Sequence, residues 1–68
     1  MEKESKEIQA VKIIRKRERS VWKKAVWCKE HNMKLEELLH RELQEELGKI
    51  ARELEDLFDT GYVSVPYD

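Results

Sequence analysis

Residues 27–39 read Trp-Cys-Lys-Glu-His-Asn-Met-Lys-Leu-Glu-Glu-Leu-Leu and separate two apolar stripes of the chain. The downstream stripe recurs every three or four residues, as one face of an amphipathic α-helix does. Its members are Leu35, Leu38, Leu39, Leu43, Leu47, Ile50, Leu54, Leu57 and Phe58. After Gly, Asn is the residue that most readily takes the left-handed conformation that ends a helix, and Asn32 lies between the stripes. We therefore expect two helices joined by a tight turn at residues 31–34.

The upstream stripe is shorter and predicts a helix from Ser20 to about His31, with Ser20 as its N-cap. This stripe contains Val21, Trp22, Ala25, Val26 and either Cys28 or Lys29. The downstream helix should extend to about Phe58. Gly48 is either a tolerated weak point or the end of one helix before another begins at Lys49, and we favour a continuous helix. The alternation in residues 62–65 is typical of a short extended segment that docks, or of a disordered tail.

Residues 9–15 fit two different structures. The spacing of Ile8, Val11 and Ile14 fits a helix, whereas the β-branched Val11, Ile13 and Ile14 fit a strand. A helix through this region would have no apolar residue between Ile14 and Val21, so almost two turns would have nothing to bury. We therefore predict a strand over residues 9–15, with one basic helix over residues 5–31 as the alternative.

Length and composition predict one small intracellular domain that needs a partner. The chain has 68 residues, 43% of them charged. A domain of this size buries only about 60% of its unfolded surface, and a second chain often supplies the rest. The single cysteine, Cys28, excludes an intrachain disulfide and favours a reducing compartment such as the cytoplasm. No apolar run approaches the ~20 residues needed to span a bilayer, so we expect no membrane partner.

The formal charge of -1 hides two halves of opposite sign. Residues 1–24 carry nine Lys and Arg against four Glu, or +5, while residues 25–68 carry five against eleven acidic residues, or -6. Within residues 12–24, which we call the basic segment, seven basic side chains are opposed only by Glu18. Such a concentration predicts binding to phosphate, as in nucleic acid, although a solvated helix face gives the same pattern.

The order strand, helix, turn, helix, with basic residues on the strand, resembles the ribbon-helix-helix superfamily of MetJ/Arc-type repressors. The resemblance covers residues 9–47 and is strongest at Asn32, Met33, Lys34 and Leu35, followed by Glu37-Leu38-Leu39. The sequence departs from the family pattern in having Asn32 in place of Gly and Lys34 in place of a Ser or Thr cap. The resemblance implies a mainly α homodimer in which the two strands form a ribbon that enters the major groove of double-stranded DNA.

Specific residues follow from this resemblance. Lys12 and Lys16 would contact bases, or Arg15 and Arg17 if the strand register shifts by one residue. Phosphate contacts would come from Lys34 at a helix start, helped by Lys23 or Lys24. The implied dimer core consists of Val11, Ile13, Val21, Trp22, Ala25, Leu38, Leu39, Leu43 and Leu47. The implied function is that of a small sequence-specific transcriptional regulator, such as a repressor.

The predicted organisation has a flexible arm at residues 1–8, a ribbon-helix-helix core at 9–47 and an acidic helical extension with a tail at 48–68. The extension lengthens the dimer interface or receives a second protein. The alternative fold is an all-α helical hairpin dimer that does not bind DNA. It would act as a small inhibitor, an adaptor or an antitoxin-like toxin-binding protein. A basic helix that binds an anionic surface ranks third.

The remaining chemistry-bearing residues favour structural roles. Cys28 and His31 lie three apart, but zinc sites normally contain more closely paired ligands, so we expect no metal and no cofactor. No orienting third group or Gly-rich phosphate loop accompanies them, so we predict no enzymatic activity. His40 is expected at the surface or in an interface. Trp22 and Trp27 lie five apart on one helix and cannot share a face, so we expect one to anchor the core and the other to cover the dimer seam.

Overall fold

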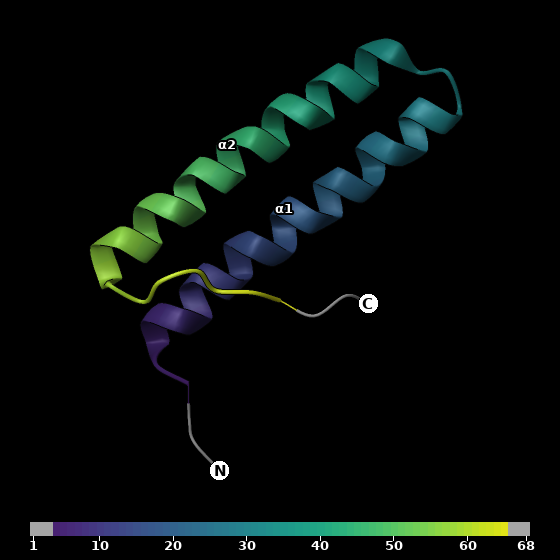
Figure 1. Ribbon diagram of the computed structural model, residues 1–68. Coiled ribbons are helices and arrows are strands. Elements are labelled where there is room, and N and C mark those ends of the chain that lie inside the picture. The colour runs from purple at the N-terminus through teal and green to yellow at the C-terminus, as the bar shows by residue number, and fades with distance from the viewer. Residues whose placement is uncertain (1–3, 66–68) are drawn as a thin grey trace.

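The structure, a computed structural model that describes residues 4–65, is a hairpin of two antiparallel helices (Figure 1). Helix α1 spans Lys6–Glu30 and helix α2 spans Lys34–Phe58. Residues 59–65, which we call the tail, leave α2 and return past the first half of α1. Residues 1–3 and 66–68, the ends of the predicted arm and extension, lie outside the described residues.

The predicted strand at residues 9–15 is wrong, because α1 is helical without a break from Lys6. The N-cap is Ser5 rather than Ser20, and the Ser5 hydroxyl accepts a hydrogen bond from the backbone N–H of Ile8 at 3.2 Å. A ribbon-helix-helix fold requires an N-terminal strand, and residues 4–65 contain no strand. That fold is therefore contradicted, and the helical hairpin that we gave as the alternative is what this chain forms.

The error lay in assuming that only apolar residues can fill the inward positions of α1. Arg15 is just 8% exposed and pairs with Glu55 of α2, which is 5% exposed. Glu18, one turn later, also pairs with Arg15. The turns between Ile14 and Val21 thus bury a polar network, and a buried charge of this kind is tolerated when it is paired and hydrogen-bonded.

The turn between the helices has the predicted form. Asn32 has φ = 57°, the left-handed conformation. The backbone N–H of Met33 donates to the carbonyl of Cys28 at 2.8 Å, and the N–H of His31 donates to the carbonyl of Trp27 at 3.1 Å. These bonds satisfy carbonyls that the end of α1 would otherwise leave without a partner.

Helix α2 continues through Gly48, which confirms the predicted continuous helix to Phe58. Gly48 is buried, and a Cβ atom placed on it would lie 2.8 Å from Oε2 of Glu18. The residue that looked like a weak point is therefore where the Glu18 side chain crosses closely over α2. The helix ends at Phe58, and its C-cap Asp59 has φ = 54°, the left-handed conformation.

The buried apolar side chains are small. They are Val11, Val21, Ala25, Cys28, Ala51, Val63 and Val65. The last two belong to the tail, so the tail completes the core on one side of the hairpin. None of these residues is a leucine, although α2 contains seven of them. The apolar stripe that predicted α2 is therefore largely outside the core of the single chain.

Candidate interaction face

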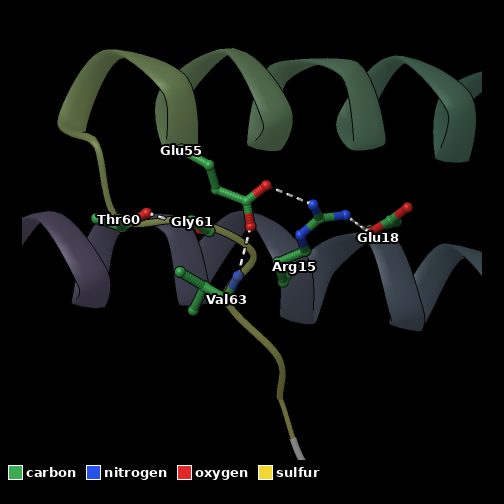
Figure 2. A network of polar contacts seen from close by, with 6 residues as sticks. All are labelled: Arg15, Glu18, Glu55, Thr60, Gly61 and Val63. Atoms are coloured by element: carbon green, nitrogen blue, oxygen red, sulfur yellow. Dashed lines mark hydrogen bonds and ion pairs between the residues drawn. The ribbon is translucent and has the colours of Figure 1, made fainter.

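The tail is held by a buried network that centres on Glu55 (Figure 2). One carboxylate oxygen of Glu55 accepts a hydrogen bond from Arg15 at 2.8 Å, and the other accepts from the backbone N–H of Val63 at 2.6 Å. The Arg15 guanidinium also lies 4.8 Å from the centre of the Tyr62 ring. Arg19 donates to the carbonyl of Val65 at 2.8 Å. Two arginines of α1 and one glutamate of α2 thus fix the path of the tail.

Both charged groups of this network are stabilised in their ionised forms. Burial by itself raises the pKa of Glu55, but hydrogen bonds from the Val63 N–H and from Arg15 outweigh it, so the pKa of Glu55 lies below its usual value. Burial by itself lowers the pKa of Arg15, but its hydrogen bonds with Glu55 and Glu18 outweigh this and raise the pKa. The network is an internal ion pair that holds the tail against the two helices.

The leucines of α2 lie on a different side of the helix from its inward face. Gly48, Ala51 and Glu55 are buried and mark the inward direction. With 3.6 residues per turn, Leu43 and Leu57 lie roughly 110–150° around the helix from that direction. Their exposed fractions are 49% and 74%. Helix α2 therefore turns Gly48, Ala51 and Glu55 toward α1 and leaves five of its seven leucines exposed.

The exposed apolar surface extends from α2 onto α1. A groove beside it is lined by Arg17, Ser20, Val21 and Lys24 of α1 and by Leu43 and Leu47 of α2. We define the leucine face as this groove together with the α2 residues Leu39, Leu43, Leu47, Ile50, Leu54 and Leu57. Arg17 and Lys24 form the α1 edge of the leucine face.

The tail lies on the other side of the hairpin. A second concavity is lined by the tail residues Tyr62 and Val65, together with Arg15, Arg19, Trp22 and other residues of the two helices. It shares no residue with the groove of the leucine face. The tail therefore covers one side of the helix pair and leaves the leucine face uncovered.

The residues predicted to contact DNA occupy different environments. Lys16, Arg17, Lys23, Lys24 and Lys34 are exposed. Lys12 forms an ion pair with Glu4, and Arg15 lies in the interior. The ribbon that would have carried the base contacts is absent from residues 4–65. DNA binding by these side chains stays a prediction, but insertion of a two-stranded ribbon into the major groove is no longer its mechanism.

The predicted dimer core divides into two groups. Val11, Val21 and Ala25 are buried within the single chain. Leu47 is half-buried, and the other members are exposed: Ile13, Trp22, Leu38, Leu39 and Leu43. The exposed group can be covered only by residues outside the described hairpin.

Cys28 and the histidines have local partners. Cys28 is buried, and its sulfur lies 4.0 Å from Nδ1 of His40. His40 Nδ1 also lies 2.7 Å from the carbonyl of Glu36. The His31 ring stacks on Trp27 with 3.9 Å between the ring centres. Within residues 4–65, no group of three or more Cys, His, Asp or Glu side chains is placed to hold a metal ion.

Sequence reasoning missed Glu18, Gly48 and Glu55, although α1 contained a signal for the first. The inward positions of α1 follow helical spacing and include two charged residues among apolar ones; they are Val11, Arg15, Glu18, Val21, Ala25 and Cys28. A charged pair three residues apart within such a stripe indicates a buried polar network. The α2 partner of Arg15 could not be identified in this way, because α2 has many glutamates.

The fold places this chain in the class of charged two-helix hairpins. Its tail covers one side of the helix pair and leaves the leucine face on the other side uncovered. No protein-family model, no curated protein and no solved structure matches the sequence. Within the described residues, neither helix is both long and apolar enough to cross a membrane.

Proposed function

We propose that this chain is a non-enzymatic helical interaction protein that buries its leucine face against the helices of another polypeptide. The observation that carries the proposal is the direction of the α2 leucines, which point to water while Gly48 and Ala51 face α1. Full burial of one leucine side chain contributes roughly 1.5–3 kcal/mol. Several leucines on one side therefore provide a large driving force for association.

Two features indicate that the leucine face is a binding surface and not a chance exposure of apolar residues. Monomeric soluble proteins rarely expose large contiguous apolar patches, and such patches often mark binding sites. The leucine face is also built on two packed helices rather than on a loop, so its geometry is largely formed before a partner arrives. An amphipathic helical surface of this kind binds a helical partner through residues spaced three and four apart.

The experiment compares two glutamate variants of matched chemistry. Leu43→Glu/Ile50→Glu places charge on the leucine face, whereas Leu38→Glu places charge at an exposed leucine outside it. We expect wild type and Leu38→Glu to associate in sedimentation or to bind a dye specific for apolar surfaces. The double variant should lose both properties while it keeps its helical circular dichroism. The proposal is wrong if the double variant behaves like wild type.

Nucleic-acid binding is a second candidate, favoured by the exposure of Lys16, Arg17, Lys23 and Lys24 on α1. It would be an electrostatic contact of one helix with phosphates, and its affinity would fall steeply with salt. Titration of a mixed-sequence DNA duplex at ~0.05 M and at ~0.15 M salt tests it, because phosphate contacts weaken as salt rises. Binding at low salt that falls at the higher salt would support this candidate, and no binding at either salt would dismiss it.

A further inference from the structure

We propose that the occupant of the leucine face is a second copy of this chain, docked with α1 of each copy against α2 of the other. The two hairpins would form a four-helix bundle with both interhelical turns at the same end. This inference rests on the proposed function and names its partner. It is carried by the charges that border the leucine face and by their positions along the two helices.

The two edges of the leucine face carry opposite charges. On the α1 edge, Arg17 and Lys24 are exposed and line the groove. On the α2 edge, the exposed Glu42, Glu46 and Glu53 lie within about one third of a turn of the leucines. Lys49 lies on the same edge and forms an ion pair with Glu46 at 3.7 Å, so the edge has a net negative charge. A surface with one basic edge and one acidic edge complements itself when a copy is turned so that unlike edges meet.

The heights of these charges match in that arrangement. Lys24 and Leu43 line the same groove, so they lie at similar heights along the hairpin. A twofold axis parallel to the helices keeps every residue at its own height and places α1 over the partner's α2. Lys24 then falls beside Glu42 and Glu46 of the second copy, and Arg17 falls about two turns further along, beside Glu46 and Glu53.

The α1 edge also brings its own apolar residues to the contact. Ile13, Arg17, Ser20, Lys24 and Trp27 follow steps of 4, 3, 4 and 3, the spacing of a helix packing seam. Ile13 and Trp27, at the two ends of this row, are 56% and 52% exposed. In the proposed dimer Trp27 covers the region of Leu39, and Ile13 covers the region of Leu54 and Leu57.

The other simple twofold arrangement is disfavoured by charge. An axis across the helices would place α1 on α1 and α2 on α2, with the turns at opposite ends. Arg17 and Lys24 would then meet the same basic residues of the partner, and the glutamates of α2 would meet glutamates. Like charges placed together across an interface oppose association. The position of the turns therefore distinguishes the two arrangements.

A distance measurement on the full chain tests the arrangement. A spin label is attached at Lys34→Cys, next to the turn, in a Cys28→Ser background. Because a helix of 25 residues is about 37 Å long, labels at opposite ends would be separated by roughly that distance or more. With both turns at one end, we expect a pair distance below roughly 30 Å, set by helix packing distances of 8–10 Å plus the label arms. A long distance would overturn the arrangement.

Charge exchange tests the pairing itself. Variant one carries Arg17→Glu and Lys24→Glu, and variant two carries Glu46→Arg and Glu53→Arg. Each alone should dimerise at least tenfold more weakly than wild type, and an equal mixture should recover dimerisation as a heterodimer. Lys29→Glu is the matched control, because Lys29 lines a groove with Trp22 and Arg41 outside the leucine face. Unchanged dimerisation of both variants would overturn the pairing.

The outcomes separate this inference from the proposed function. If wild type sediments as a monomer at high micromolar concentration but loses dye binding in Leu43→Glu/Ile50→Glu, the second copy is the wrong occupant and the interaction protein stands with a different partner. If the leucine variants change neither association nor dye binding, both proposals are wrong. A dimer with a short label distance and mutual rescue of the charge variants supports both.

Discussion

The two sides of the hairpin, the tail side and the leucine face, differ in how their apolar residues are covered. On one side the chain covers itself, because the tail places Val63 and Val65 over the helices and fixes them through Glu55 and Arg19. On the other side Leu39, Leu43, Ile50 and Leu57 are exposed, and Leu47 and Leu54 are half-buried. Directional hydrogen bonds fix one specific path for the tail, whereas the leucine side offers strong but less directional attraction.

This difference shows where a small charged domain can place its apolar residues. The buried side chains are mostly valine and alanine, and at Gly48 the end of the Glu18 side chain lies close to the backbone of α2. Most of the larger aliphatic side chains of α2 lie outside the buried core. Part of the apolar surface of this chain of 68 residues is thus left uncovered by the chain itself.

The largest effect is expected on the closed side. Glu55→Ala leaves Arg15 buried with its main partner missing and removes the acceptor of the Val63 N–H. Loss of one member of a buried ion pair costs about 3–5 kcal/mol. Urea denaturation at one fixed protein concentration measures the change. Hydrogen exchange should also show the Val63 amide losing its protection.

A double variant shows whether charge or shape holds this side together. Arg15→Met/Glu55→Leu replaces the pair by apolar groups of similar size, and such replacements are often neutral or stabilising. We expect it to recover most of the stability lost in Glu55→Ala but not the protection of the Val63 amide. A double variant as unstable as the single one would show that apolar packing cannot replace the ion pair and its hydrogen bonds.

The closed side should also be weakened by acid. Because the folded-state pKa of Glu55 is lowered, its ionisation stabilises the fold fully above the unfolded pKa of about 4.3. This contribution is lost as pH falls through the lower folded value. Glu55→Gln should therefore flatten the acid limb of a plot of unfolding free energy against pH. An acid limb of unchanged slope in Glu55→Gln would contradict the assignment.

The sequence predicted the helices better than it predicted the way they pack. The leucine spacing and Asn32 were sufficient for α2 and for the turn, because both are local properties. The start of α1 was predicted wrongly because Arg15 occupies an inward position of the helix. Its burial there is stabilised by Glu55, a residue 40 positions away in the sequence. The periodicity of the leucines also could not predict the direction in which they point. It locates an apolar stripe on a helix but does not show whether the same chain covers that stripe.

A pair of truncations compares the two sides directly. Val63→Ala removes buried methyl groups and should destabilise the monomer by about 1–2 kcal/mol. Leu43→Ala removes more carbon from a half-exposed position and should cost less, about 0.5 kcal/mol, at concentrations where the chain is monomeric. At higher concentration the cost of Leu43→Ala should grow and that of Val63→Ala should not. Equal costs at all concentrations would remove the distinction between the sides.

The smallest net effect is expected at Gly48, where two contributions oppose each other. Alanine in the middle of a helix is favoured over glycine by about 1 kcal/mol. Its Cβ, however, would meet Oε2 of Glu18, so the carboxylate must move away from its contact with Arg15. The Glu18 side chain is partly exposed and can move into water, so this costs about as much as a weak ion pair, up to ~1 kcal/mol.

Gly48→Ala should therefore change the unfolding free energy by less than about 1 kcal/mol. In a Glu18→Ala background the obstacle is gone, and the same substitution should give the full helix gain of about 1 kcal/mol. The difference between the two backgrounds, measured by urea denaturation, is the coupling between Glu18 and residue 48. Equal effects in both backgrounds would mean that Glu18 does not obstruct a side chain at position 48, and that the glycine has no packing role.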